Sequence, residues 1–215
     1  MSKAGPIRLA VFASGSGSNF EALVKAIRKQ TIEAEVALLV SDKPDAFALT
    51  RADTLAVPSV SFYPKQFPSK EVFEREVLDH LKEADIDLIV LAGYMRIIGQ
   101  TLLEAFDNRI INIHPSLLPL YPGKQGIQDA FDAGAKETGV TVHLVDEGID
   151  TGTILAQEKV VIDPDDTIES LEEKLHAVEH VLYPEVIQTY IKICRRSMPN
   201  YDTCTYQCIK QDQYR

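Results

Sequence analysis

Short apolar runs alternate with longer amphipathic segments through the first half of the chain. The apolar runs predict buried strands at 7–12, 36–40, 59–62, 86–91 and 109–113. The segments between them carry apolar residues at helical spacing and predict helices at 20–29, 46–56, 69–83 and 101–106. Such alternation favours a parallel sheet with helices on both faces.

The second half continues with a helix and two strands, predicted at 125–133, 138–145 and 153–161. A last long helix begins at a capping-box pattern, Asp166 to Glu169, and periodicity is lost beyond Arg195. Its apolar stripe, which we expect to face the core, is Ile168, Leu171, Leu175, Val178 and Leu182. We therefore predict one α/β domain over 1–195, with a mostly parallel twisted sheet and a Rossmann-like N-terminal half, and a flexible tail over 196–215.

The composition is that of one globular domain, and the net charge argues against some classes of binding partner. The 215 residues are 45% hydrophobic, and the formal charge of −10 opposes non-specific binding to nucleic acid or anionic membrane. No apolar run approaches the ~20 residues of a membrane span, and no signal peptide is evident. Three clustered cysteines, Cys194, Cys204 and Cys208, make a poor disulfide framework and no familiar zinc spacing. We expect a reduced, cytoplasmic protein without a metal site.

The strand ending at Ile113 presents polar side chains where a ligand would bind. Residues two apart on a strand share a side, so Asn112 and His114 face one surface, and Pro115 then ends the ladder. Open α/β sheets bind ligands at the carboxyl ends of their strands. This segment is therefore a candidate active site.

A glycine- and serine-rich loop, Ser14 to Asn19, joins the first strand to the first helix. Free backbone N–H groups and the helix dipole favour an anion there, such as a phosphate. The loop is neither a P-loop nor a full dinucleotide fingerprint, although Asp42 after the second strand is placed to hold a ribose. Phosphate binding, dinucleotide binding and a purely structural turn all remain open.

Three further features have competing interpretations. His176 to His180 matches the HxxEH pattern of some metallopeptidases, but a surface face, or a single ligand contact from Glu179, explains it as well. Asp150 lies in a turn-rich corner, where it is either an ordinary turn residue or a carboxylate brought against another strand. His143, within a strand, is most simply a hydrogen-bonded core histidine.

Several segments, in order, resemble the folate-dependent phosphoribosylglycinamide formyltransferases of purine synthesis. The matching segments are Ser14–Asn19, Ala92–Ile97, Asn112–Pro119, Tyr121–Gly123 and Val142–Gly152. The segment around His114 is shared with other users of formyl-tetrahydrofolate. The glycine loop and Tyr121–Gly123 narrow the resemblance to this family.

The resemblance implies a role for each matching residue. The implied catalytic residues are Asn112, His114 and Asp150. The implied ribotide-binding residues are Gly17, Ser18, Asn19 and Glu179. The implied folate-binding residues are Lys70, Met95, Arg96, Ile97, Ile98, Asn112, Val145, Asp146, Glu147, Gly148 and Ile149. On this basis the half over about 1–105 binds phosphate, and the half over about 106–195 completes the folate and catalytic site.

The implied reaction moves a formyl group from 10-formyltetrahydrofolate, a co-substrate, to the amine of glycinamide ribonucleotide, without a metal. Asn112 and His114 would stabilise the oxyanion, and Asp150 would keep His114 cationic or relay a proton. We expect small-molecule substrates only, and a monomer or homodimer. A methionyl-tRNA formyltransferase, a formyltetrahydrofolate hydrolase and a non-enzymatic ribotide-binding module are the rivals.

Overall fold

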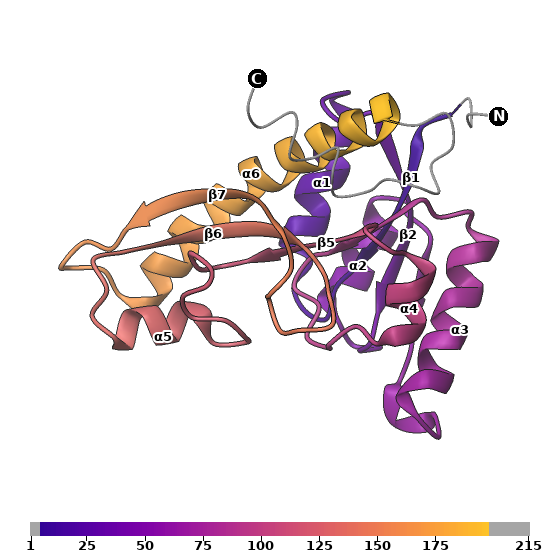
Figure 1. Cartoon of the computed structure of the whole chain (residues 1–215), viewed down its shortest axis with the longest axis horizontal. Helices are drawn as coiled ribbons and strands as arrows, with labels where there is room; N and C mark the ends of the chain where they lie inside the picture. The colour runs from indigo at the N-terminus through magenta and orange to yellow at the C-terminus, as the bar shows by residue number, and fades with distance from the viewer. Residues whose placement is uncertain (1–4, 198–215) are drawn as a thin grey trace.

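A single sheet passes through the molecule, which the computed structural model describes over residues 5–197. Its strands are β1 (Ile7–Phe12), β2 (Ala34–Ser41), β3 (Ser59–Ser61), β4 (Leu88–Leu91), β5 (Ile110–His114), β6 (Glu137–Leu144) and β7 (Ile154–Val161). They lie in the order β3-β2-β1-β4-β5-β6-β7 (Figure 1). The strands from β3 to β5 are parallel, whereas β6 and β7 are antiparallel to their neighbours. The mostly parallel sheet that we predicted is confirmed.

Helices cover both faces of the sheet, as predicted. They are α1 (Ser18–Arg28), α2 (Phe47–Thr54), α3 (Lys70–Glu83), α4 (Gln100–Ala105), α5 (Gly126–Asp132) and α6 (Ile168–Ser197), with a short 3-10 helix η1 (Pro64–Gln66). One hydrophobic core joins the sheet to α1, α2 and α6, and a second joins it to α3 and α4. Figure 1 shows α3 and α4 on the side of the sheet away from α6.

Alternation along the strands assigns each side chain to one of these two cores. In β1, Leu9 and Val11 belong to the first core, while Ala10 and Phe12 belong to the second. Each is fully buried, and a buried side chain of the size of Leu9 or Phe12 contributes about 1.5–3 kcal/mol. In β5, Ile111 and Ile113 pack into the first core, so Asn112 and His114 extend from the opposite side. The same alternation that builds the core therefore places both polar residues together.

The predicted elements are present, and the structure corrects some of their ends. Strand β4 begins at Leu88 rather than residue 86, because the Asp87 carboxylate accepts the Arg8 N–H at 2.9 Å in place of a strand carbonyl. The capping box of α6 is formed by Thr167 and Ser170, whose hydroxyls accept each other's backbone N–H, one residue beyond the predicted pattern. The short η1 was not predicted.

The C-terminal helix is longer than predicted, since α6 continues to Ser197 past the expected end at residue 195. Residues 198–215 of the predicted tail, with Cys204 and Cys208, lie outside the described residues. Within residues 5–197, no helix is both long and apolar enough to cross a membrane.

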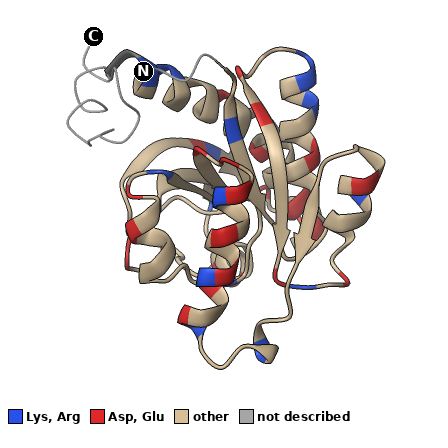
Figure 2. Ribbon diagram, turned by 90° about the vertical axis from the view of Figure 1, so that its right-hand side faces the viewer, with Lys and Arg blue, Asp and Glu red and all other residues tan. Residues whose placement is uncertain are grey.

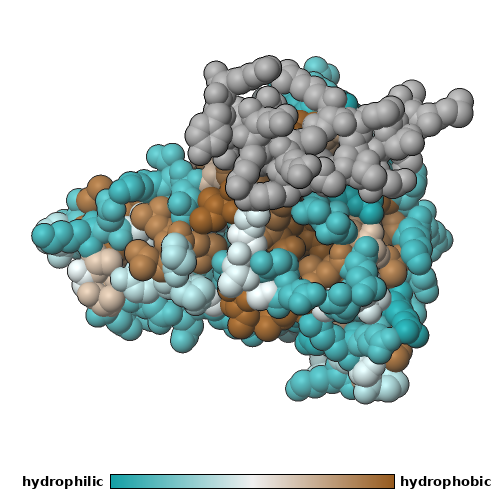
Figure 3. Space-filling model, in the orientation of Figure 1, coloured by the Kyte–Doolittle hydropathy of each residue, from teal (hydrophilic) through white to brown (hydrophobic). Residues whose placement is uncertain are grey.

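Charge and hydropathy are distributed unevenly over the surface. Acidic and basic residues are interspersed along the helices in Figure 2, with acidic residues in excess over the whole chain. Apolar residues gather near the middle of the face shown in Figure 3, between more polar ends.

Candidate active site

A cavity of about 640 Å³ opens at the carboxyl ends of β1, β4 and β5. Strand β1 lies between β2 and β4, so the direction of winding reverses there, and a crevice forms where open α/β sheets bind ligands. The loop after β6 and the helix α6 complete its walls. The site is therefore where the strand pattern places it.

Most of the predicted site residues line this cavity. Those from the predicted ribotide and catalytic sets are Gly17, Ser18, Asn19, Glu179, Asn112, His114 and Asp150. Those from the predicted folate set are Met95, Arg96, Ile97, Ile98, Val145, Asp146, Gly148 and Ile149. Two predicted folate residues do not line it. The Nζ of Lys70 lies 3.8 Å from Glu74 Oε1 on α3, and Glu147 lines a second hollow beside α4.

The glycine loop is shaped by its packing against α2. Gly17 has φ +74°, and a Cβ at that position would lie 2.7 Å from the Cβ of Ala48, so a side chain there would clash and be strained. Gly15 O accepts the Ala48 N–H at 3.0 Å, and Ser16 O accepts the Arg51 Nε–H at 2.8 Å. Ser18 and Asn19, at the start of α1, line the cavity, and the first N–H groups of a helix have no partner inside it, which favours an anion there.

Asn19 and Glu179 form a buried pair at the base of this loop. The Nδ2 of Asn19 donates to Glu179 Oε2 at 2.8 Å, and both side chains are buried. Burial raises the pKa of Glu179, and the bond from Asn19 opposes that rise. The Oδ1 of Asn19 is buried and has no partner among the described residues. This pair therefore offers polar atoms to a ligand that reaches the loop.

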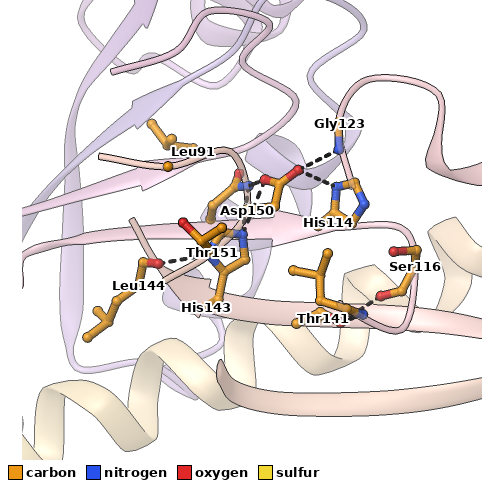
Figure 4. A network of polar contacts seen from close by, with 12 residues as sticks. Leu91, His114, Ser116, Gly123, Thr141, His143, Leu144, Asp150 and Thr151 are labelled. Carbon is orange, nitrogen blue, oxygen red and sulfur yellow. Dashed lines mark hydrogen bonds and ion pairs between the residues drawn. The ribbon is translucent and has the colours of Figure 1, made fainter. Parts of the chain in front are cut away.

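The carboxylate of Asp150 is the point where the catalytic candidates meet (Figure 4). Its Oδ2 lies 3.5 Å from His114 Nδ1, and its Oδ1 lies 3.4 Å from Asn112 Nδ2. The backbone N–H of Gly123 donates to Oδ2 at 2.7 Å. Asp150 also has φ +54°, a conformation uncommon for a residue with a side chain. The turn-rich corner thus brings a carboxylate against the end of β5, one of the two interpretations left open by the sequence.

His143, which the sequence indicated only as a core histidine, is part of the same cluster. Its Nε2 lies 3.1 Å from Asn112 Nδ2 and 3.5 Å from Asp150 Oδ1, and its ring is almost fully buried. The register of β5 and β6 places His143 directly opposite Asn112. Only an antiparallel pairing of 109–113 with 138–145 brings His143 beside Asn112, and no local pattern in the sequence specifies that pairing.

The electrostatics of this cluster favour an ionised carboxylate. The contact with His143 is the largest cause, and together with the Gly123 N–H and the nearby His114 it lowers the pKa of Asp150 to about 2, against the opposing effect of burial. Asp150 is therefore charged throughout the neutral range.

Each of the two histidines makes a short hydrogen bond to a backbone carbonyl through the ring nitrogen that does not contact Asp150. His114 Nε2 lies 2.8 Å from the carbonyl of Tyr121, and since a carbonyl only accepts, this nitrogen carries a proton. His143 Nδ1 likewise lies 2.8 Å from the carbonyl of Leu144. By contrast, the contacts of Asn112, His114 and His143 with Asp150 are 3.4 to 3.5 Å long. Such long contacts are weak, so a substrate atom can replace them at little cost.

The alternative interpretations of Asp42 and of the HxxEH pattern find less support. Asp42 is buried, accepts a hydrogen bond from the Ser14 hydroxyl and does not line the cavity, so it does not offer a ribose contact. His176 and His180 stack on each other, while Glu179 is bonded to Asn19. Within residues 5–197, no group of three His, Cys, Asp or Glu side chains is arranged to hold a metal ion.

Comparisons with known proteins show which family the chain resembles. The profile described as formyl transferase matches residues 7–187. The chain is 49% identical over 189 residues to the phosphoribosylglycinamide formyltransferase of Bacillus subtilis, covering 88% of this chain and 97% of that one.

Solved structures give the same result. Glycinamide ribonucleotide transformylase 1 of Geobacillus kaustophilus is 56% identical, with a TM-score of 0.84 over 86% of this chain and 98% of that one. The phosphoribosylglycinamide formyltransferase of Bacillus halodurans is 48% identical, with a TM-score of 0.86 over 91% of this chain and 100% of that one.

Proposed function

The chain belongs to the formyl transferase family, and we propose that Asn112, His114 and Asp150 catalyse its reaction. The chain transfers a formyl group from 10-formyltetrahydrofolate to the amine of N1-(5-phospho-D-ribosyl)glycinamide in purine (IMP) biosynthesis. The products are the N2-formyl compound and tetrahydrofolate. The observation that carries the proposal is the meeting of Asn112, His114 and His143 at Asp150, in the same cavity as the glycine loop.

The two substrates occupy opposite ends of the cavity in this proposal. The loop from Gly17 to Asn19 holds the phosphate of the ribotide, and Glu179 accepts hydrogen bonds from its ribose. The segment from Met95 to Ile98 and the loop from Val145 to Ile149 hold the folate. Exposed Met95, Ile97 and Ile149 supply the apolar surface that the pteridine and benzoyl rings require. The formyl carbon and the amine then meet in front of Asn112 and His114.

Each bond change has a residue beside it. The amine nitrogen attacks the formyl carbon, and the carbonyl oxygen takes the negative charge of the tetrahedral intermediate. Asn112 donates the N–H that otherwise makes the 3.4 Å contact with Asp150, an effect worth ~3 kcal/mol in comparable oxyanion sites. When the bond from carbon to folate N10 breaks, His114 donates its proton to N10. It recovers a proton from the former amine nitrogen through water, so no net proton is gained or lost.

Asp150 acts on His114 through its charge in this scheme. A carboxylate whose pKa is lowered to about 2 is a weak base, so it is poorly suited to be the final acceptor of the amine proton. Its Oδ2 lies 3.5 Å from His114 Nδ1, where the negative charge interacts favourably with a proton donor on the ring. His143 and Gly123 N–H hold the carboxylate in place for this role.

We also propose that the chain works in the cytoplasm as a monomer or homodimer, without nucleic acid or membrane. The net charge of −10 supports the last part of this proposal, because it opposes non-specific binding to nucleic acid and to anionic membranes. Cell fractionation, and sedimentation of the purified chain with and without substrates, test these points. Sedimentation with tRNA or anionic vesicles would contradict them.

The decisive test of the reaction is a formyl-transfer assay with the purified chain. Tetrahydrofolate should form only when formyl-folate and the ribotide are both present, and His114→Asn should abolish that formation. Release of formate without the ribotide would favour the hydrolase, and transfer to methionyl-tRNA would favour the tRNA formyltransferase. Binding of the ribotide without any turnover would favour the non-enzymatic ribotide-binding module.

A further inference from the structure

We infer that Ser14 and Glu74 are positioning residues that fix the two ends of the Gly93–Gly99 segment at the folate end of the cavity. This inference rests on the proposed function, which assigns Met95 to Ile98 to folate binding. Neither residue lines the cavity, and neither takes part in the proposed chemistry. Both are buried polar groups, 3% exposed in each case, whose contacts with this segment the catalytic scheme leaves unexplained.

At the first end, Ser14 forms two hydrogen bonds with the turn at Gly93. Its N–H donates to Gly93 O at 3.1 Å, and its Oγ accepts the Met95 N–H at 2.9 Å. The Oγ–H itself donates to Asp42 Oδ1 at 2.5 Å. A serine hydroxyl has one hydrogen, so a bond to a buried carboxylate fixes its direction and leaves a lone pair for Met95. The role of Asp42 is thus to orient Ser14.

At the second end, Glu74 of α3 reaches the start of α4. Its Oε1 accepts the Gly99 N–H at 2.6 Å, and a Cβ on Gly99 would lie within 2.7 Å of both carboxylate oxygens. Burial raises the pKa of Glu74, while the Gly99 N–H and the ammonium of Lys70 oppose the rise. A buried carboxylate needs such partners, and here they come from the two segments that it joins. Lys70, predicted as a direct folate contact, supports this anchor instead of lining the cavity.

Between its two ends the segment is neither helix nor strand. Met95 is 45% exposed and Ile97 is 54% exposed, so packing restrains these two side chains only partly. A segment of this kind keeps conformational freedom unless hydrogen bonds fix its backbone. A ligand that orders it must offset the loss of conformational entropy. The anchors at Ser14 and Glu74 therefore reduce the entropy lost when folate binds.

Ser14 also lies next to Gly15, at the start of the glycine loop. Its backbone N–H nonetheless bonds to Gly93 and its Oγ to Met95, both at the folate end, whereas the loop is held by Ala48 and Arg51. Loss of the Ser14 hydroxyl should therefore weaken folate binding more than ribotide binding. A general loss of stability would affect both ligands alike.

Calorimetric titration of the full chain with tetrahydrofolate and, separately, with the ribotide tests the inference. Ser14→Ala and Glu74→Met should each raise the Kd for tetrahydrofolate about tenfold, the loss of a buried hydrogen bond, and change the Kd for the ribotide less than about twofold. Glu74→Gln keeps an acceptor for Gly99 and should recover most of the folate affinity. If Glu74→Met does not fold, Ser14→Ala, which removes a single atom, remains as the test.

Two control variants match the test variants in residue type and substitution. Ser41→Ala removes a buried hydroxyl at the end of β2 that, among the described residues, bonds to Lys43 of its own turn. Glu71→Met removes an acid from the same helix as Glu74, but at an exposed position in its first turn. Both should bind tetrahydrofolate like the unaltered chain. Unchanged folate affinity in Ser14→Ala, or equal losses for the two ligands, would overturn the inference. If the unaltered chain binds no folate, the proposed function itself is wrong.

Discussion

Two regions of the cavity are built from different chemical groups: the glycine loop after β1, called here the parallel end, and the cluster at β5 and β6, called here the antiparallel end. At the parallel end, the loop after β1 presents backbone N–H groups whose direction is set by Gly17 and the start of α1. At the antiparallel end, β5 and β6 present the side chains of Asn112 and His143 opposite each other, and the corner after β6 adds Asp150. In the proposed mechanism, binding of the phosphate thus depends on backbone geometry, and catalysis on side-chain chemistry. Substitutions at the two ends should therefore change different kinetic parameters.

The largest expected effect is at the antiparallel end. Asp150→Asn keeps the size of the side chain but removes the charge beside His114, so kcat should fall by about a thousandfold, comparable with the loss of a residue that holds a catalytic histidine. The KM for the ribotide should stay within about threefold, because the glycine loop is untouched. Steady-state kinetics with both substrates varied measure this. Unchanged turnover would remove Asp150 from the mechanism.

A smaller effect is expected for His143, which contacts two of the proposed catalytic residues. His143→Leu removes the ring that contacts both Asn112 and Asp150, and we expect kcat to fall about thirtyfold, as when a supporting partner of a catalytic group is lost. The pKa of Asp150 should also rise, since His143 is the main cause of its low value. The control is His80→Gln, which replaces a half-buried histidine on α3 that packs against Phe62 and does not line the cavity. Equal rates for both variants would show that His143 is only a core residue.

At the parallel end, the expected change is in binding. Asn19→Ala removes the donor to Glu179 and an amide oxygen without a partner, and the KM for the ribotide should rise about tenfold. The KM for the folate and the value of kcat should change little. An equal rise in both KM values would contradict the division of the cavity into two ends.

The two ends also differed in how far the sequence could predict them. Asn112 and His114 followed from strand alternation and the stop at Pro115, and the glycine loop followed from its place between a strand and a helix; both are local patterns. His143 was missed because its role depends on which strand lies beside β5 and in which direction, and no local pattern specifies that pairing. The turn-rich corner made Asp150 a candidate with two open interpretations, and only the resemblance implied a catalytic role, since a turn aspartate has no periodic signature.

Lys70 and Asp42 show a second limit of sequence. The sequence predicted a ligand contact for Lys70 and placed Asp42 to hold a ribose, but neither lines the cavity. Lys70 lies 3.8 Å from the buried Glu74, and the buried Ser14 donates to Asp42. Competition between a ligand and a neighbouring side chain is decided by distances of a few ångströms between segments far apart in the sequence. The fold and the strand ends could thus be predicted, while the partners of individual charged groups required the structure.

The smallest expected effect tests the antiparallel end without any substrate. The pKa of Asp150 is lowered from 3.8 to about 2 in the folded chain, so its charge stabilises the fold above pH 3.8, and this contribution is lost as pH falls through about 2. With solvent screening, the contribution is on the order of 1 kcal/mol. The Asp150→Asn variant has no titrating group at this position. Its amide changes the free energy of unfolding only by an amount that does not depend on pH.

Urea unfolding of both proteins between pH 5 and pH 2 isolates this term. All other carboxyl groups titrate in both proteins, so the difference in the free energy of unfolding depends on Asp150 alone. As the pH falls, the free energy of unfolding of the unaltered chain should decrease relative to that of the variant by on the order of 1 kcal/mol. A difference that stays constant with pH would mean that Asp150 is not held by His143, His114 and Gly123 before substrate binds, and that the cluster forms only around the substrate.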